Sequence, residues 1–233
     1  MKKYIIAILI IVMAISTLVF NEDSIAYAIE PSASNEIEFT DETLPVDKVG
    51  VEGSVDFVDI SPDDWFYQSV MFVKDEGLMG GVSGDEFAPQ ESVTRAMLVV
   101  VLHRLEGEPK SESSKFVDIE DGQWCSDGIS WAANAGIVNG VGEGMFEPDA
   151  PITREQIATI IYKYSAQKGK IDAQSIGIIA PDKDKISDWA LEGMSWAVGQ
   201  GLINGKDGGV LDPGGEATRA EIATILMRFI QNS

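Results

Sequence analysis

The residues best suited to chemistry are three Thr-Arg pairs, at Thr94-Arg95, Thr153-Arg154 and Thr218-Arg219. Each pair precedes an apolar pattern typical of a helix, so we expect the threonine to cap the helix and the arginine to occupy its first position. A cation at a helix N-terminus opposes the macrodipole and costs about 0.3–1 kcal/mol. An unfavourable residue repeated three times in one register indicates a role outside its own helix.

Two interpretations of the arginines stay open. Each arginine, together with the free N–H groups of the helix start, could form an anion-binding site. Alternatively, each arginine pairs with an acidic residue of a neighbouring repeat, because acidic residues are plentiful and structural ion pairs are common.

Three tryptophans share the register of these pairs. Trp65, Trp124 and Trp189 are separated by 59 and 65 residues, and the same two steps separate the Thr-Arg pairs. An indole could form an apolar wall against a sugar ring, or it could belong to the core. Glycines and prolines keep the register too: Gly77, Gly136 and Gly201; Pro89, Pro148 and Pro213.

These landmarks define three repeats, each predicted to be helix, turn or short hairpin, then helix. The first helices are expected over 65–76, 124–135 and 189–200, each ended by a glycine in the left-handed conformation. The second helices begin at the Thr-Arg pairs and show an i, i+3, i+4, i+7 apolar stripe. Its members are Leu98, Val101, Leu102 and Leu105; Ile157, Ile160, Ile161 and Tyr164; and Ile222, Ile225, Leu226 and Phe229.

The second helices of repeats two and three also fit a capping box, in which the threonine is followed three residues later by Gln156 or Glu221. Met97 breaks this box in the first repeat. The repeats are placed at 57–107, 116–167 and 180–233, with an insertion near 172–179. Such repeats cannot bury their apolar faces alone and must stack on one another.

The N-terminal segment reads as a secretory signal peptide over 1–28, with Lys2 and Lys3, an apolar run, and Ala26-Tyr27-Ala28 as the cleavage site. A retained membrane anchor is the alternative, although a spanning helix needs about 20 apolar residues. Residues 29–56 are acidic and poor in apolar residues, so we expect a disordered linker.

The net charge of -21 argues against a general binder of nucleic acid or of anionic membranes, because the chain repels both. An anionic ligand must therefore be held by a few local cations. Cys125 is the single cysteine, which excludes an intramolecular disulfide and favours a small buried side chain. His103 is the single histidine, which excludes a multi-histidine metal site, and we expect it at the surface.

The repeat resembles the S-layer homology domain. The resemblance rests on Phe57-Val58-Asp59 and Phe116-Val117-Asp118, the early tryptophan, the glycine turn and the Thr-Arg helix start, and it covers about residue 57 to the C-terminus. The third repeat departs from it, with Ala180-Pro181-Asp182 in place of the opening aromatic motif and Leu211 in place of a phenylalanine. We therefore expect the second set of residues to be the most complete and the three sites to differ in affinity.

The resemblance implies a mainly α-helical, pseudo-threefold bundle that anchors a protein non-covalently to the cell surface by holding an acidic, often pyruvylated, secondary cell-wall polysaccharide in grooves between repeats. The arginines would grip the sugar carboxylate, and the tryptophans and turn glycines would shape the grooves. It implies no catalytic residue, cofactor or metal. The binding residues it predicts are Arg95, Arg154, Arg219, Trp65, Trp124, Trp189, Gly81, Gly140 and Gly205.

Three other functions stay open from the sequence. A glycoside hydrolase could use two of the many carboxylates, whose presence alone discriminates nothing. An anchored enzyme would need a second domain, and besides the repeats we expect only the acidic linker. A protein–protein adaptor could use the repeats to dock an S-layer or other envelope protein, with purely structural arginines.

Overall fold

The computed structural model describes residues 57–171 and 177–232. The predicted signal peptide and acidic linker lie outside the described residues. Within the described residues the protein is helical and has no sheet, as the sequence predicts. The six α-helices are α2 (Tyr67–Asp75), α3 (Arg95–Leu105), α4 (Ser126–Asn134), α5 (Arg154–Gln167), α6 (Leu191–Gly199) and α7 (Arg219–Gln231).

Short 3-10 helices occur only in the third repeat of the described chain, at Lys183–Lys185, Asp188–Ala190 and Asp207–Gly209. Two isolated antiparallel bridges, Ser83 with Glu86 and Gly142 with Met145, form the short hairpins of the first two repeats. No helix in the described ranges is both long and apolar enough to cross a membrane.

The first helix of each repeat begins later than predicted, two residues after its tryptophan. The reason is that the residue after each tryptophan enters the core: Phe66, Cys125 and Ala190 are all buried. The tryptophans themselves point outward, with Trp65, Trp124 and Trp189 exposed by 65%, 61% and 57%. Membership of the core, one of the two interpretations of these tryptophans, is therefore wrong.

The predicted helix caps are confirmed. Thr94, Thr153 and Thr218 each accept a hydrogen bond from the backbone N–H three residues later. The reciprocal capping box is present at the starts of α5 and α7 only. At the other end of the first helices, Gly77, Gly136 and Gly201 adopt φ of 67°, 72° and 67°, the left-handed conformation expected of a helix-ending glycine.

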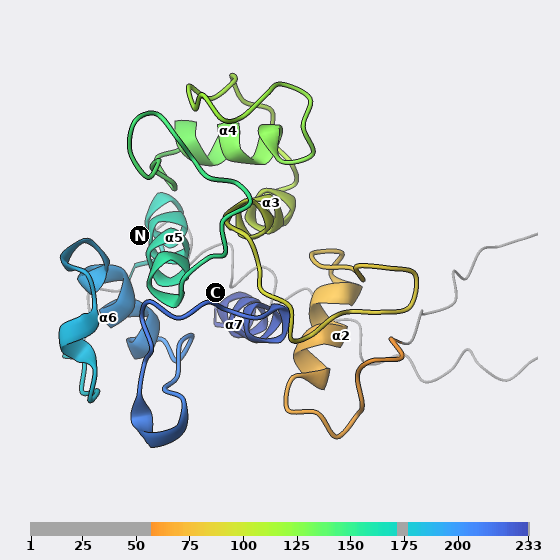
Figure 1. Ribbon diagram of the computed structural model, residues 1–233, viewed down its shortest axis with the longest axis vertical. Helices are drawn as coiled ribbons and strands as arrows, with labels where there is room; N and C mark the ends of the chain where they lie inside the picture. Colours follow the sequence, from red (N-terminus) through yellow and green to blue (C-terminus); the bar gives the residue numbers. More distant parts are fainter. Residues whose placement is uncertain (1–56, 172–176, 233) are drawn as a thin grey trace, which may run out of the picture. The chain divides into compact units, whose positions relative to one another are not determined.

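The helices pack in pairs that cross repeat boundaries. The first helix of repeat two, α4, packs on α3 of repeat one, and α6 of repeat three packs on α5 of repeat two (Figure 1). The first helix of repeat one, α2, packs on α7 of repeat three, which closes the series. Each pair thus joins two repeats, and the three pairs together link all three repeats.

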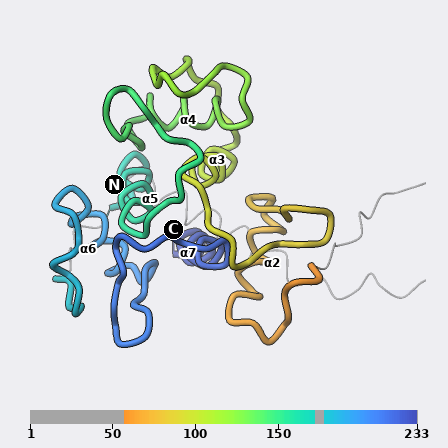
Figure 2. The backbone as a smooth tube through the Cα atoms, viewed as in Figure 1, coloured from red at the N-terminus to blue at the C-terminus, as the bar shows by residue number. Residues whose placement is uncertain are grey.

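A ring of backbone hydrogen bonds joins the segments that lead into α3, α5 and α7, whose course can be followed in Figure 2. The N–H of Val93 donates to the carbonyl of Ala217 at 3.0 Å, that of Ala217 to Ile152 at 3.2 Å, and that of Ile152 back to Val93 at 2.9 Å. Each repeat therefore donates once and accepts once, and the ring has no free edge.

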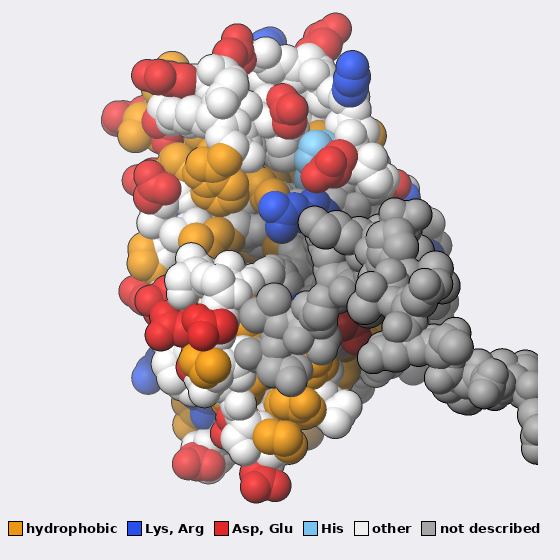
Figure 3. Space-filling model, turned by 90° about the vertical axis from the view of Figure 1, so that its right-hand side faces the viewer, with side chains coloured by type: hydrophobic (Ala, Val, Ile, Leu, Met, Phe, Trp, Pro, Cys, Tyr) orange, Lys and Arg blue, Asp and Glu red, His pale blue; other side chains and the backbone are white. Residues whose placement is uncertain are grey.

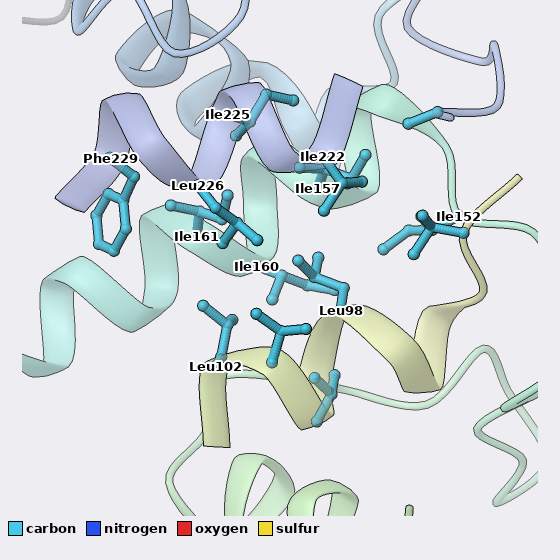
Figure 4. Close-up of a cluster of buried hydrophobic side chains, with 14 of the residues drawn as sticks. Leu98, Leu102, Ile152, Ile157, Ile160, Ile161, Ile222, Ile225, Leu226 and Phe229 are labelled. Carbon is cyan, nitrogen blue, oxygen red and sulfur yellow. The ribbon is translucent and has the colours of Figure 1, made fainter. Parts of the chain in front are cut away.

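The predicted apolar stripes meet between α3, α5 and α7. Figure 4 shows Leu98 and Leu102 of α3 facing Ile160 and Ile161 of α5, with Leu226 of α7 beside them. All these side chains are at most 5% exposed. Because burial of apolar area is the main stabilising term in folding, this shared core holds the three repeats as one unit.

The predicted burial of the single cysteine is confirmed, whereas the predicted exposure of the single histidine is not. Cys125 is buried, as expected, and burial raises the pKa of its thiol. The expectation of a surface His103 is wrong: it is 7% exposed, its Nε2 lies 2.9 Å from the carbonyl oxygen of Pro109, and its ring centroid lies 5.4 Å from that of Trp131. The cause is the pairing of α4 with α3, which covers a face that the sequence of α3 alone suggested was outside.

Candidate functional site: three grooves between repeats

Three grooves lie between repeats, and each is built from all three of them. An arginine comes from one repeat, the glycine turn and one face of the second helix come from the next, and a tryptophan comes from the third. Groove 1 contains Arg95, residues 137–141, α5 and Trp189; groove 2 contains Arg154, residues 202–206, α7 and Trp65; groove 3 contains Arg219, residues 78–81, α3 and Trp124.

The predicted site residues thus come together, but not in sets of one repeat each. Gly140 shares groove 1 with Arg95 and Trp189 rather than with Arg154 and Trp124. The second set, expected to be the most complete, is therefore distributed over all three grooves. The grooves also differ in size, with volumes of about 410, 160 and 170 Å³ for grooves 1, 2 and 3.

Each groove arginine is buried and bridges two repeats. The Nε of Arg95, Arg154 and Arg219 donates to a carbonyl of the following repeat, at Phe146, Leu211 and Phe87 respectively, over 2.9, 2.8 and 2.7 Å. The Arg95 and Arg219 guanidinium groups also lie over the rings of Phe146 and Phe87, at 4.7 and 4.5 Å from the centroids. The arginines are therefore structural as well as groove-lining.

The guanidinium ends differ between grooves. The terminal nitrogens of Arg154 donate to Glu221 Oε1 at 3.3 Å and to the Asn204 carbonyl at 2.8 Å. Arg219 donates to the Gly80 carbonyl at 2.6 Å. Among the described residues, no carboxylate pairs with Arg95 or Arg219. The interpretation of the arginines as partners of acidic residues therefore holds for Arg154 and is wrong for the other two.

The helix N-termini do not contribute free N–H groups, and that part of the anion-site hypothesis is wrong. The N–H of Arg95 donates to the Ala150 carbonyl and that of Ala96 to Pro148, both at 3.0 Å. Equivalent loop carbonyls, those of Gly215, Pro213, Glu91 and Pro89, occupy the first amides of α5 and α7. Because the neighbouring repeat satisfies these donors, an anion in a groove must rely on side chains.

A second cation in each groove was missed by the sequence reasoning. Arg104, Lys163 and Arg228 follow the three groove arginines by nine residues, and they line grooves 3, 1 and 2 respectively. At about 100° per residue, positions nine apart lie on opposite sides of a helix, so the two cations of one helix serve different grooves. Their shared register was the signal that could have identified them.

The turn glycines line the grooves because no larger residue fits. A Cβ on Gly81 would lie 2.7 Å from the carbonyl oxygen of Glu86, and one on Gly140 would overlap the carbonyl oxygen of Met145. Gly205 is similarly close to the backbone of Gly209. The turn therefore folds tightly against its own hairpin, which leaves the groove floor open.

An aspartate fixes the carbonyl that each arginine uses. Asp118 accepts hydrogen bonds from the N–H groups of Phe146 and Glu147, so the peptide joining these two residues has an aspartate at its N–H and Arg95 at its oxygen. Asp59 and Asp182 do the same for the other two arginines. The third repeat thus keeps the aspartate although it has lost the aromatic residue.

The second residue of each clamped pair has a left-handed backbone although it is not glycine: Ala88, Glu147 and Asp212 have φ of 56°, 57° and 53°. Such a conformation is uncommon for residues other than glycine, least so for aspartate, and for Ala88 and Glu147 it persists only where the surroundings enforce it. The aspartate hydrogen bonds supply that enforcement. Burial by itself raises the pKa of Asp118 and Asp182, but the main-chain N–H donors outweigh it and lower both pKa values overall.

The grooves concentrate positive charge on an acidic protein. On the face in Figure 3, acidic side chains are spread widely, whereas Lys and Arg are few. Burial lowers the pKa of Arg95 below its ordinary value, and the charges of Glu147 and Asp118 partly offset this; burial lowers the pKa of Arg219 in the same way, with Glu91 and Asp59 as the offsetting charges. Both arginines stay charged, because an arginine cannot be deprotonated in a protein under ordinary conditions.

Comparison with known proteins agrees with this architecture. The family model described as the S-layer homology domain matches residues 56–96, 115–158 and 181–223. The chain is 32% identical over 182 residues to an exoglucanase, XynX, of Acetivibrio thermocellus, which is 77% of this chain and 17% of that protein. It is 29% identical over 156 residues to a cellulosome-anchoring protein of the same species, 65% of this chain and 35% of that one.

A third relative is the S-layer protein EA1 of Bacillus anthracis, which is 26% identical over 172 residues, or 73% of this chain and 19% of that protein. The chain therefore spans only a minor part of the curated relatives it matches. Their names describe proteins much longer than the shared region.

Proposed function

The chain belongs to the S-layer homology domain family, whose domains anchor proteins to the cell surface, and we propose that it does so by binding an acidic, pyruvylated secondary cell-wall polysaccharide in its three grooves. The observation that carries the proposal is the threefold recurrence of at least two cations beside an outward-pointing tryptophan. This combination suits a ligand that has both a carboxylate and an apolar sugar face.

The chemistry of the two parts is complementary. Arginine presents a planar fork of N–H donors that matches a carboxylate, and the second cation adds charge from the second helix of the next repeat. An indole offers a flat apolar surface on which the C–H face of a sugar ring can rest. A neutral sugar could accept hydrogen bonds from the cations but would form no ion pair with them, so the cations confer a preference for acidic sugars.

Three grooves suit an anchor better than one. A single charge-assisted hydrogen bond contributes about 1.5–3 kcal/mol net, which alone gives weak attachment. Once one groove holds a polymer, the others meet it at high effective concentration, and avidity can rise by about 10²–10⁴. This proposed activity is binding and requires no nucleophile, proton transfer, cofactor or metal.

The test is co-sedimentation of the protein with purified cell-wall sacculi, half of which are stripped of their secondary polymer. We expect pelleting with intact walls only. The informative variant replaces the second cations, Arg104→Gln, Lys163→Gln and Arg228→Gln, because the buried arginines also bridge repeats and their loss would confound folding with binding. This variant should fold as the parent does and lose most of its pelleting.

A matched control removes three exposed lysines outside the grooves, Lys110→Gln, Lys115→Gln and Lys183→Gln. It has the same change in charge, so retained pelleting would attribute the loss to groove position. Equal pelleting with stripped and intact walls would overturn the polysaccharide proposal. Binding that instead depends on a wall-associated protein would support an adaptor that docks an S-layer or other envelope protein.

A further inference from the structure

One helical position differs in charge among the three grooves. The third residue of the second helix lines its groove in every repeat, and it is Gln156 in groove 1, Glu221 in groove 2 and Met97 in groove 3. Only groove 2 has a carboxylate at this position.

Glu221 is engaged with the cations of its own groove. Its Oε1 lies 3.3 Å from a terminal nitrogen of Arg154 and 3.9 Å from Nζ of Lys206. The Arg154 side chain is only 5% exposed and that of Glu221 is 19% exposed, so water screens this pair poorly. Lys206 is also paired with Asp212 at 2.8 Å.

Groove 1 has the opposite arrangement. Arg95 donates through Nε to the Phe146 carbonyl, and no hydrogen bond from its terminal nitrogens to a described residue is present. Its neighbours Gln156 and Lys163 add no negative charge, and the groove volume is about 410 Å³ against about 160 Å³ for groove 2. Its guanidinium therefore retains more donors for an incoming anion.

We propose that Glu221 is a built-in competitor for the ligand carboxylate, so that groove 1 takes an acidic sugar first and groove 2 takes it last. The carboxylate of Glu221 already satisfies the donor of Arg154 that a ligand carboxylate would need, and it repels a second anion. This inference rests on the proposed function, since it ranks the grooves for the same class of ligand.

The capping boxes allow a clean exchange of the two residues. Gln156 and Glu221 each accept a hydrogen bond from the N–H of the capping threonine, at 3.2 and 3.1 Å. Glu221→Gln therefore gives groove 2 the box that groove 1 already has, and Gln156→Glu does the reverse. Both variants keep side-chain length and helix start, so neither is expected to unfold.

Each groove also contains its own reporter. Protein labelled with 5-fluorotryptophan gives separate ¹⁹F signals for Trp189, Trp65 and Trp124, while the partly buried Trp131 and the buried Trp196, which line none of the grooves, serve as internal references. The probe is the methyl glycoside of a sugar with a 4,6-linked pyruvate ketal. Its methyl ester, which has nearly the same shape without the charge, is the control.

In the parent protein we expect the Trp189 signal to respond at the lowest probe concentration and the Trp65 signal at the highest. Glu221→Gln should lower the Trp65 midpoint by about tenfold, and Gln156→Glu should raise the Trp189 midpoint by about tenfold, the factor expected when one charge-assisted contact is exchanged. The ester should remove these differences.

Two results would overturn the inference in distinguishable ways. Equal midpoints for Trp189 and Trp65 that neither variant changes would reject Glu221 as a competitor and leave polysaccharide binding intact. Absence of any difference between acid and ester at all three tryptophans would reject the proposed function itself, and the ranking of the grooves with it.

Discussion

The centre of the repeat array and its grooves differ in how closely they keep threefold equivalence. At the centre, Val93, Ile152 and Ala217 form one closed ring of hydrogen bonds, and the Nε of every groove arginine donates to the equivalent loop carbonyl of the next repeat. In the grooves, the third helical residue changes from methionine to glutamine to glutamate, and groove volumes differ more than twofold. The contrast indicates that folding constrains the centre, whereas the groove walls are free to diverge.

The largest expected effect comes from breaking the centre. Ile161 is 1% exposed between α3, α5 and α7, and Ile161→Ala should cost about 2–5 kcal/mol of unfolding free energy through lost burial and a cavity. Chemical denaturation followed by circular dichroism measures it. Because helix pairs cross repeat boundaries, the unfolding should remain a single transition.

Two separate transitions in the Ile161→Ala variant would contradict a shared core. Val117→Ala, at a side chain that is 73% exposed, provides the control and should change the unfolding free energy by less than about 0.5 kcal/mol.

The next effect tests the connection between centre and groove. Asp118→Asn replaces a carboxylate that accepts from two main-chain N–H groups with an amide that can accept through one oxygen only. We expect a loss of about 1–3 kcal/mol in unfolding free energy, because the acceptor is weaker and no longer fully holds the left-handed backbone of Glu147. Asp149→Asn changes an exposed aspartate in the loop that contains Glu147, and it should leave the unfolding free energy unchanged. Equal effects of the two variants would reject the clamp.

Low pH should weaken the hydrogen bonds that Asp118 and Asp182 accept, with a smaller effect on the unfolding free energy. The pKa values of Asp118 and Asp182 are lowered in the folded state, so their contribution to stability is present above the ordinary value of 3.8 and is lost as pH falls through the lower folded values. Denaturation midpoints measured over this acidic range should decline. The decline should be shallower in Asp118→Asn, and this difference cancels general charge effects; parallel curves would contradict it.

The smallest expected effect on stability comes from substituting a groove tryptophan, which lies outside the centre of the repeat array. Trp189 is 57% exposed, so Trp189→Ala should change the unfolding free energy by less than about 0.5 kcal/mol. The same change should weaken pelleting with intact sacculi, and Trp189→Phe should retain most of it because an aromatic face remains. A large loss of stability would show that this indole supports the fold rather than the groove.

The sequence by itself determined the parts of this protein. Local rules predicted the three repeats, the second helices with their threonine caps and the glycine helix ends, because capping and apolar periodicity depend on residues a few positions apart. The resemblance to the S-layer homology domain, rather than these rules, predicted nine binding residues, all of which line the grooves, but it did not predict the second cations. The same local rules misplaced the starts of the first helices and the position of His103, since both depend on what a neighbouring repeat covers.

Tertiary structure alone decided how the parts combine. The exchange of helices between repeats takes Arg95, Gly140 and Trp189 from three repeats into one groove, and no spacing along the chain encodes that grouping. It also places the carbonyls of Pro148 and Ala150 on the amides of α3, which removes the helix terminus from any anion site. Local sequence does not determine which helix faces meet, because that depends on contacts between distant residues. The closed ring of three repeats is the arrangement in which each repeat buries its apolar face against its neighbours.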